Sequence, residues 1–149
     1  MPANTTPQDL LAMLLEGINE GRWTDLSHLY ADDAVVEQPL LAPTPGRLVG
    51  REQIDAHFSA AASGPIRLRV RDLVVHATTD PEVVIAEYDY EVTHTVTGCT
   101  TTVANIQVLR GRDGKIQATR DYHDHLRLAA VAGRAEQLAA ATARAITMD

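Results

Sequence analysis

The segment NIQVLRGRDGKIQATRDYHDH, from Asn105 to His125, gives the clearest indication of the fold of this chain. It predicts two strands joined by a tight turn, because the Asp113-Gly114 pair favours the positive φ of a short hairpin. The second strand ends in a polar cluster, and successive side chains of a strand point to opposite faces. Asp121, His123 and His125 therefore share one face, and Arg120, Tyr122 and Asp124 share the other. Any chemistry of the chain is expected on one of these two faces.

Outside this hairpin, the spacing of apolar residues is typical of helices in some segments and of strands in others. Helices are predicted from Pro7 to about Gly21, over Trp23–Tyr30 and over Arg51–Ala62, and a short strand over Ala34–Gln38. The proline-rich stretch Leu40–Gly50 is predicted to be a loop. Further strands are expected over Ile66–Ala77, Val83–Val96, Thr100–Leu109 and Ile116–His125, followed by a helix over Leu126–Ile146. This order predicts an α+β fold in which helices cover one face of a curved antiparallel sheet.

Length and composition set further bounds. The 149 residues are 45% hydrophobic and suit one domain over residues 1–149, with a core over about 8–126 and a C-terminal helix over 127–146. Thirteen basic and twenty acidic residues give a net charge of −7, which argues against a nucleic-acid partner. A single cysteine, no secretion signal and no apolar run long enough for a membrane span predict a cytoplasmic protein.

Three motifs carry a resemblance to a known family. LYADDAVVEQP at residues 29–39 is similar to the ketosteroid isomerase pattern YADDATVEDP, and GREQI at residues 50–54 is similar to the start of the third helix there. GKI at residues 114–116 and RDYHD at residues 120–124 resemble the ending of limonene-type epoxide hydrolases and SnoaL-type cyclases. The chain thus resembles the nuclear-transport-factor-2-like superfamily, which implies a cone-shaped curved sheet wrapped around N-terminal helices.

The resemblance assigns candidate residues one position at a time. The general base of the isomerases falls at Gln38, their tyrosine at Leu14 and their protonated aspartate at Gln107, so their mechanism is not expected. The epoxide hydrolases place a water-binding amide at Gln38 and an aspartate at Asp121.

Two further epoxide-hydrolase positions are altered. The arginine and the other aspartate of those enzymes fall at Tyr88 and Tyr90, which leaves the ionic relay incomplete. The proposed general base of SnoaL-type cyclases falls at Asp121, the one acidic group kept at a catalytic position of the family.

Strand parity, taken from the resemblance and extended by alternation, indicates which side chains face the cavity. The inward set is Tyr88, Tyr90, Val92, His94, Asn105, Gln107, Leu109, Asp121 and His123, with His125 near the mouth, and the outward set is Glu87, Asp89 and Glu91. The predicted catalytic residues are Asp121 and His123, about 6–7 Å apart along the strand. The predicted substrate-binding residues are Gln38, Tyr88, Tyr90, His94, Asn105 and Gln107.

Electrostatics suggest how these groups would work. Burial would raise the pKa of Asp121, and a carboxylate near His123 would raise the pKa of that imidazole. Asp121, His123 and His125 together could also bind a metal ion. The resemblance implies neither a metal nor another cofactor.

Two classes of function remain open at this point. The first is an enzyme that performs acid–base chemistry on a small, mostly apolar molecule of polyketide, terpenoid or steroid type, as a cyclase, isomerase or hydrolase. The second is a binding protein that holds such a ligand unchanged, and limonene-type epoxide hydrolysis is a further alternative. The resemblance also implies a homodimer through the outer face of the sheet, where Val75, Ile106 and Val108 are candidates.

Overall fold

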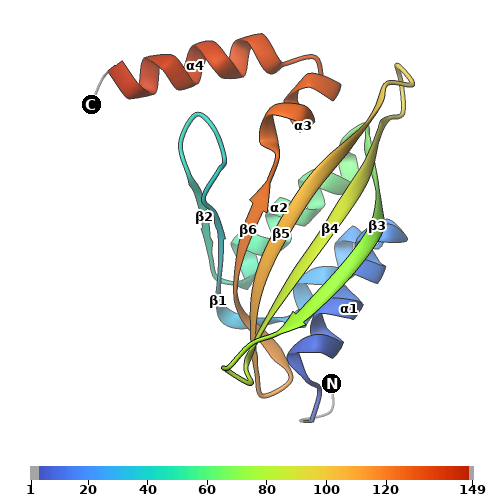
Figure 1. Cartoon of the computed structure of the whole chain (residues 1–149), viewed down its shortest axis with the longest axis vertical. Coiled ribbons are helices and arrows are strands. Elements are labelled where there is room, and N and C mark those ends of the chain that lie inside the picture. Colours follow the sequence, from blue (N-terminus) through green and yellow to red (C-terminus); the bar gives the residue numbers. More distant parts are fainter. Residues whose placement is uncertain (1–3, 148–149) are drawn as a thin grey trace.

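The computed structural model describes residues 4–147 and shows one curved sheet with helices against its concave face (Figure 1). In chain order the elements are α1 (Pro7–Asn19), the 3₁₀ helix η1 (Trp23–Leu29), β1 (Tyr30–Gln38), β2 (Gly46–Val49), α2 (Arg51–Ser63), β3 (Ile66–Ala77), β4 (Val83–His94), β5 (Thr100–Arg112), β6 (Lys115–His123), α3 (His125–Val131) and α4 (Ala135–Thr147). The six strands lie in the order β2-β1-β6-β5-β4-β3. The predicted α+β cone fold is confirmed.

Helix α1 closes the inside of the sheet. The Thr6 side chain accepts a hydrogen bond from the Asp9 N–H while the Asp9 carboxylate accepts one from the Thr6 N–H, which forms a capping box, and Pro7 occupies the first turn. One face of the helix then buries apolar side chains at helical spacing: Leu10, Leu11, Leu14, Leu15 and Ile18. These side chains join the inward side chains of β4, β5 and β6 in a single hydrophobic core.

The sheet is antiparallel except at one pair of strands. β1 runs parallel to β6, and every other neighbouring pair is antiparallel. The turn between β5 and β6 has φ of 53° at Asp113 and 74° at Gly114, the positive values that the Asp-Gly pair predicted. β1 also begins four residues earlier than expected, and the predicted loop contains the edge strand β2.

A bulge in β3 reverses one outward assignment. Asp72 has a φ of 56°, and the register with β4 shifts between Arg71 and Val74. Val75 is therefore paired with Ala86, which is fully buried on the concave side. The prediction that Val75 points outward is wrong, because an added residue in one strand inverts the alternation beyond it.

The C-terminal segment forms two helices, where the sequence predicted one. Gly133 has a φ of 74° between α3 and α4, a conformation that ends a helix. Helix α4 packs on α3 and projects away from the sheet (Figure 1). None of the helices within residues 4–147 is long and apolar enough to cross a membrane.

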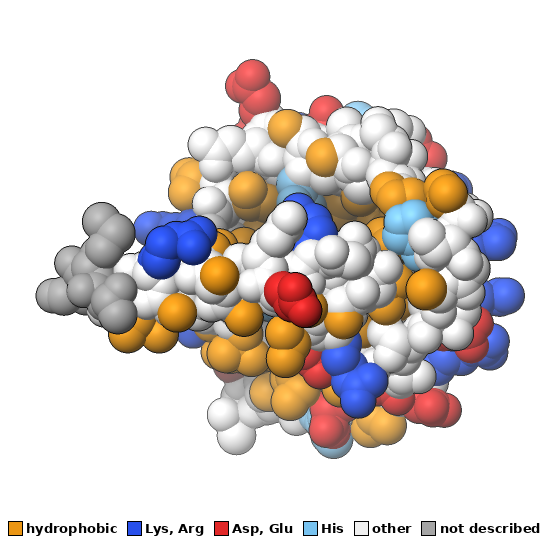
Figure 2. All heavy atoms as spheres, turned by 90° about the horizontal axis from the view of Figure 1, so that it is seen from above, with side chains coloured by type: hydrophobic (Ala, Val, Ile, Leu, Met, Phe, Trp, Pro, Cys, Tyr) orange, Lys and Arg blue, Asp and Glu red, His pale blue; other side chains and the backbone are white. Residues whose placement is uncertain are grey.

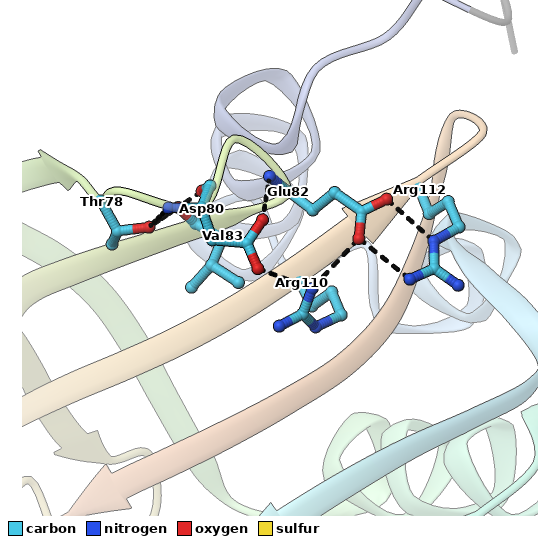
Figure 3. A network of polar contacts seen from close by, with 6 residues as sticks. All are labelled: Thr78, Asp80, Glu82, Val83, Arg110 and Arg112. Atoms are coloured by element: carbon cyan, nitrogen blue, oxygen red, sulfur yellow. Dashed lines mark hydrogen bonds and ion pairs between the residues drawn. The ribbon is translucent and has the colours of Figure 1, made fainter.

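An ionic network links the turn between β3 and β4 to β5 (Figure 3). The Glu82 carboxylate accepts hydrogen bonds from Arg110 and Arg112 at 2.8–3.0 Å, and Arg110 also donates to Asp80 at 3.0 Å. The Thr78 hydroxyl lies within 2.9 Å of the carbonyl oxygens of Asp80 and Val83. Each exposed ion pair contributes little to the free energy of unfolding alone, but together the pairs join the β3–β4 turn to the end of β5.

Candidate active site in the cone cavity

A cavity of about 560 Å³ lies between the concave face of the sheet and the helices. Its wall is mostly apolar and includes Leu14, Ile18, Trp23, Val36, Ile54, Phe58, Leu68 and Leu128. Its polar lining comes from Tyr30, Gln38, Arg47, His57, Tyr88, Tyr90, Gln107, Asp121, His123 and His125. Viewed from the end that carries α3, the molecule is hollowed between apolar and histidine side chains (Figure 2). An apolar wall with a few converging polar groups is typical of a small-molecule site.

Asp121 is the buried carboxyl group of this cavity. Only 8% of the residue is exposed, and its Oδ1 accepts a hydrogen bond from Gln107 Nε2 at 3.0 Å. Burial raises the pKa of Asp121 to about 6, and this rise prevails although Gln107 and the nearby Thr119 hydroxyl lower the pKa. The upward direction agrees with the sequence prediction. A carboxyl group with this pKa exchanges protons readily near neutral pH.

Gln107 and Tyr88 hold this carboxyl in place. The Tyr88 hydroxyl donates to Gln107 Oε1 at 3.4 Å, which turns the amide so that its N–H group faces Asp121. β5 and β6 place Gln107 directly opposite Asp121 in the sheet register. The structure thus brings together two residues that strand parity placed on the inward face.

Three tyrosines surround the carboxyl. Tyr30, Tyr88 and Tyr90 are all buried, and burial followed by neighbouring charge, including that of Asp121, raises the pKa of Tyr30 and Tyr88 well above its usual value. Burial also raises the pKa of Tyr90. All three phenols therefore remain neutral, and a neutral phenol can donate a hydrogen bond but is not a base. The sequence prediction placed Tyr30 at the end of a helix and not among the site residues, although the first motif contains it.

His123 differs from its prediction in its electrostatics. Burial, followed by the charges of His125 and His57, lowers the pKa of His123 to about 4. The expected rise caused by Asp121 is wrong, because desolvation and the two neighbouring histidines all disfavour the charged imidazolium. The ring of His123 instead contacts Asn105, whose Oδ1 lies 2.5 Å from Nδ1.

Histidines also form the rim of the cavity. The rings of His123 and His125 lie 5.6 Å apart at their centroids, and His125 Nε2 is enclosed and has no hydrogen-bond partner within residues 4–147. Burial lowers the pKa of His57 and of His125. The position of His57 on helix α2 could not be related to the sheet from sequence alone. Within the described part of the chain, no group of three or more metal-binding side chains has the arrangement of a metal site.

Two predicted ligand-binding residues do not line the cavity. His94 lies at the end of β4, where its Nδ1 accepts hydrogen bonds from the backbone N–H groups of Val96 and Thr97 and so stabilises the turn. Asn105 is buried against His123 and lines an adjoining hollow beside α4 instead of this cavity. The other four predicted ligand-binding residues line the cavity: Gln38, Tyr88, Tyr90 and Gln107.

The acidic row of β4 points outward, as predicted. Glu87 lies 2.6 Å from His76 Nε2, and Glu91 pairs with Arg71 at 3.4 Å. These carboxylates take no part in the cavity.

The chain is similar to proteins of one known domain family. Residues 11–119 match the sequence profile of the SnoaL-like domain. The chain is 35% identical over 115 residues to an uncharacterized PhzA/B-like protein of Pseudomonas aeruginosa, a match that covers 76% of this chain and 79% of the relative.

Solved structures share the fold. A proposed isomerase from Bacillus subtilis is 24% identical with a TM-score of 0.79, covering 89% of this chain and 96% of its own. A proposed polyketide cyclase from Xanthomonas campestris pv. campestris is 22% identical with a TM-score of 0.71, and the match covers 83% of this chain and 94% of the cyclase chain. Since one fold hosts many reactions, these likenesses establish architecture and leave the reaction open.

Proposed function

The chain belongs to the SnoaL-like domain family, and from the chemistry of its cavity we propose that it is a cofactor-independent enzyme of cyclase or isomerase type. Its substrate is a small, mostly apolar organic molecule that enters the cone, and its reaction begins with transfer of a proton to Asp121. The size and apolar wall of the cavity support this class of substrate.

The buried carboxyl of Asp121 is the observation that carries this proposal. Its pKa of about 6 leaves it mostly ionised at neutral pH, yet basic enough to accept a proton from a substrate. Gln107 donates a hydrogen bond to Oδ1 of Asp121, and the Asp121 side chain lines the cavity. A carboxylate that is held by a hydrogen bond and lines the cavity in this way has the properties of a general base.

The neighbouring phenols would stabilise the charge that develops on the substrate. Removal of a proton next to a carbonyl group creates an oxyanion, and fixed hydrogen-bond donors in a water-poor site stabilise it. Tyr30 and Tyr90 line the same cavity and keep their protons because burial raises their pKa. Asp121 therefore acts as the base in this scheme, and Tyr30 and Tyr90 are the candidate donors.

Hydrogen–deuterium exchange on a small ketone tests the proposal. 1-Tetralone, a two-ring ketone with exchangeable α-protons, is incubated with the protein in D₂O and followed by NMR. We expect catalysed exchange that increases as the pH passes about 6, and a loss of roughly 10²–10⁴-fold in Asp121→Asn. Asp33→Asn removes an exposed carboxylate from β1, away from the cavity, and is the matched control. Equal exchange by the wild-type protein and Asp121→Asn would refute the assignment.

A ligand-binding role is the second candidate, and the amides at two family catalytic positions favour it. Gln38 and Gln107 donate and accept hydrogen bonds but cannot act as bases at neutral pH. Saturable binding of 1-tetralone without any catalysed exchange would support this role over the enzymatic one. The epoxide-hydrolase alternative gains no support, since buried tyrosines occupy two positions of its ionic relay.

We also propose a homodimer through the outer face of the sheet. Ile106 and Val74 are exposed there, and the face combines an arginine row on β3 with an acidic row on β4. A two-fold axis could place the arginine row of one copy against the acidic row of the other, and a self-complementary surface is what such an interface needs. Equilibrium sedimentation that finds only a 16.2 kDa species at micromolar concentration would contradict it.

A further inference from the structure

Asn105 sits where its amide can control the orientation of His123. The residue is 4% exposed on β5 and is paired directly with His123 on β6. Its Nδ2 donates to the carbonyl oxygens of Val103 at 3.0 Å and Tyr88 at 3.4 Å. Its Oδ1 lies 2.5 Å from His123 Nδ1.

This arrangement fixes which end of the Asn105 amide is the NH₂ group and which is the oxygen. Both carbonyl oxygens are acceptors, so the NH₂ end of the side chain must face them. The other end is then the carbonyl oxygen Oδ1, which accepts hydrogen bonds and cannot donate one. Nδ1 of His123 must therefore carry the proton of the short contact between them.

We propose that Asn105 is a positioning residue that fixes His123 in the Nδ1–H tautomer, so that Nε2 presents a lone pair to the cavity and selects a ligand with an O–H or N–H group. The ligand part of this inference rests on the proposed function, whereas the tautomer does not. Asp121 and Nε2 of His123 then form two hydrogen-bond acceptors on one face of β6, and the ligand must satisfy both.

The surroundings of His123 keep its imidazole neutral. The ring faces Tyr90 with a centroid distance of 5.9 Å and His125 with one of 5.6 Å, and the charge of His57 also acts on it. Burial and the two histidines lower its pKa to about 4. Nε2 forms no hydrogen bond within residues 4–147, and the side chain lines the cavity. The neutral ring thus offers its free nitrogen to a ligand.

Nitrogen NMR of the wild-type protein tests the tautomer directly. The chain is labelled with ¹⁵N-histidine, and two-bond ¹H–¹⁵N correlation at neutral pH distinguishes protonated from unprotonated ring nitrogens. His123→Phe identifies the signals. We expect a protonated Nδ1 and an unprotonated Nε2 for His123. A protonated Nε2 or an equal mixture of tautomers would overturn the inference, and this result does not depend on folding of any Asn105 variant.

Two Asn105 variants separate positioning from packing. Asn105→Ala removes the acceptor and should give a mixture of tautomers, whereas Asn105→Asp keeps an acceptor and should retain the Nδ1–H form. An unchanged tautomer in folded Asn105→Ala would show that Asn105 does not control it. Loss of ketone exchange in Asp121→Asn tests the general base separately and leaves the prediction for His123 unchanged.

A matched pair of probes tests the ligand part. 2-Naphthol carries a hydroxyl donor, and 2-methoxynaphthalene has the same ring system without one. We expect 2-naphthol to bind roughly twofold to tenfold more tightly, the effect of one net hydrogen bond. The preference should decrease in His123→Phe, in which the Asp121 carboxylate remains as an acceptor. Equal affinities in the wild-type protein, or binding of neither probe, would overturn the predicted donor requirement.

Discussion

Replacing Asp121 with asparagine should change how stability depends on pH. In the folded chain burial raises the pKa of Asp121 to about 6, whereas an unfolded aspartate has a pKa of about 3.9. Between these values the folded protein binds more protons than the unfolded chain, so the free energy of unfolding falls as the pH rises. The asparagine side chain of the variant carries no charge at any pH and would remove this loss.

The pKa difference sets the size of the effect. A shift of about two pKa units corresponds to about 3 kcal/mol of unfavourable ionisation in the folded state above the folded pKa. Roughly half of that cost is already present at about pH 5, where the unfolded carboxyl is ionised and the folded one is mostly protonated. The other half develops between about pH 5 and pH 8, as the folded carboxyl ionises. We therefore expect the free energy of unfolding of Asp121→Asn, relative to wild type, to rise by about 1–2 kcal/mol over this range.

Urea unfolding followed by the fluorescence of Trp23 measures this difference. The indole stacks on Phe58 beside the cavity and is the single tryptophan of the chain. Asp33→Asn removes an exposed carboxylate on β1 and controls for net charge, with an expected effect within about 0.5 kcal/mol. A difference between Asp121→Asn and wild type that stays flat with pH, or that falls as the pH rises, would refute a raised pKa.

Three other substitutions test separate parts of the structure. Gln107→Leu removes the donor to Oδ1 and should raise the pKa of Asp121 above about 6, which carboxyl NMR would detect. Gly111→Ala would place a Cβ 2.9 Å from Leu10 Cδ1 and should cost about 1–3 kcal/mol in urea unfolding. Gly64→Ala, with 3.6 Å to its nearest neighbour, is its control. Ile106→Asp should convert the proposed dimer to a 16.2 kDa monomer in sedimentation and leave the melting temperature of the monomer nearly unchanged.

Local alternation explains what could be predicted. The inward residues of β4, β5 and β6 follow from a period of two and an unambiguous Asp-Gly hairpin, and Gln107 lies opposite Asp121 as the parity required. The raised pKa of Asp121 followed from its inward position beneath an apolar layer. These features depend on one hairpin and the strands next to it.

The remaining features depend on contacts between distant parts of the chain. The bulge at Asp72 has no clear signal in the sequence, yet it changes the side of Val75. The short contact between Asn105 and His123 requires the exact register of two strands, and desolvation by the whole cavity wall sets the low pKa of His123. Tyr30 enters the site because β1 pairs in parallel with β6, which alternation cannot show.

The pKa of Asp121, measured by carboxyl ¹³C NMR, is the most direct test of the proposed general base. Aspartate is labelled at its side-chain carboxyl carbon, Asp121→Asn identifies the resonance, and the chemical shift is followed from acidic to alkaline pH. The structure predicts a pKa of about 6. A pKa at or below about 4 would describe an ordinary ionised carboxylate and would contradict a base poised for proton transfer in this cavity.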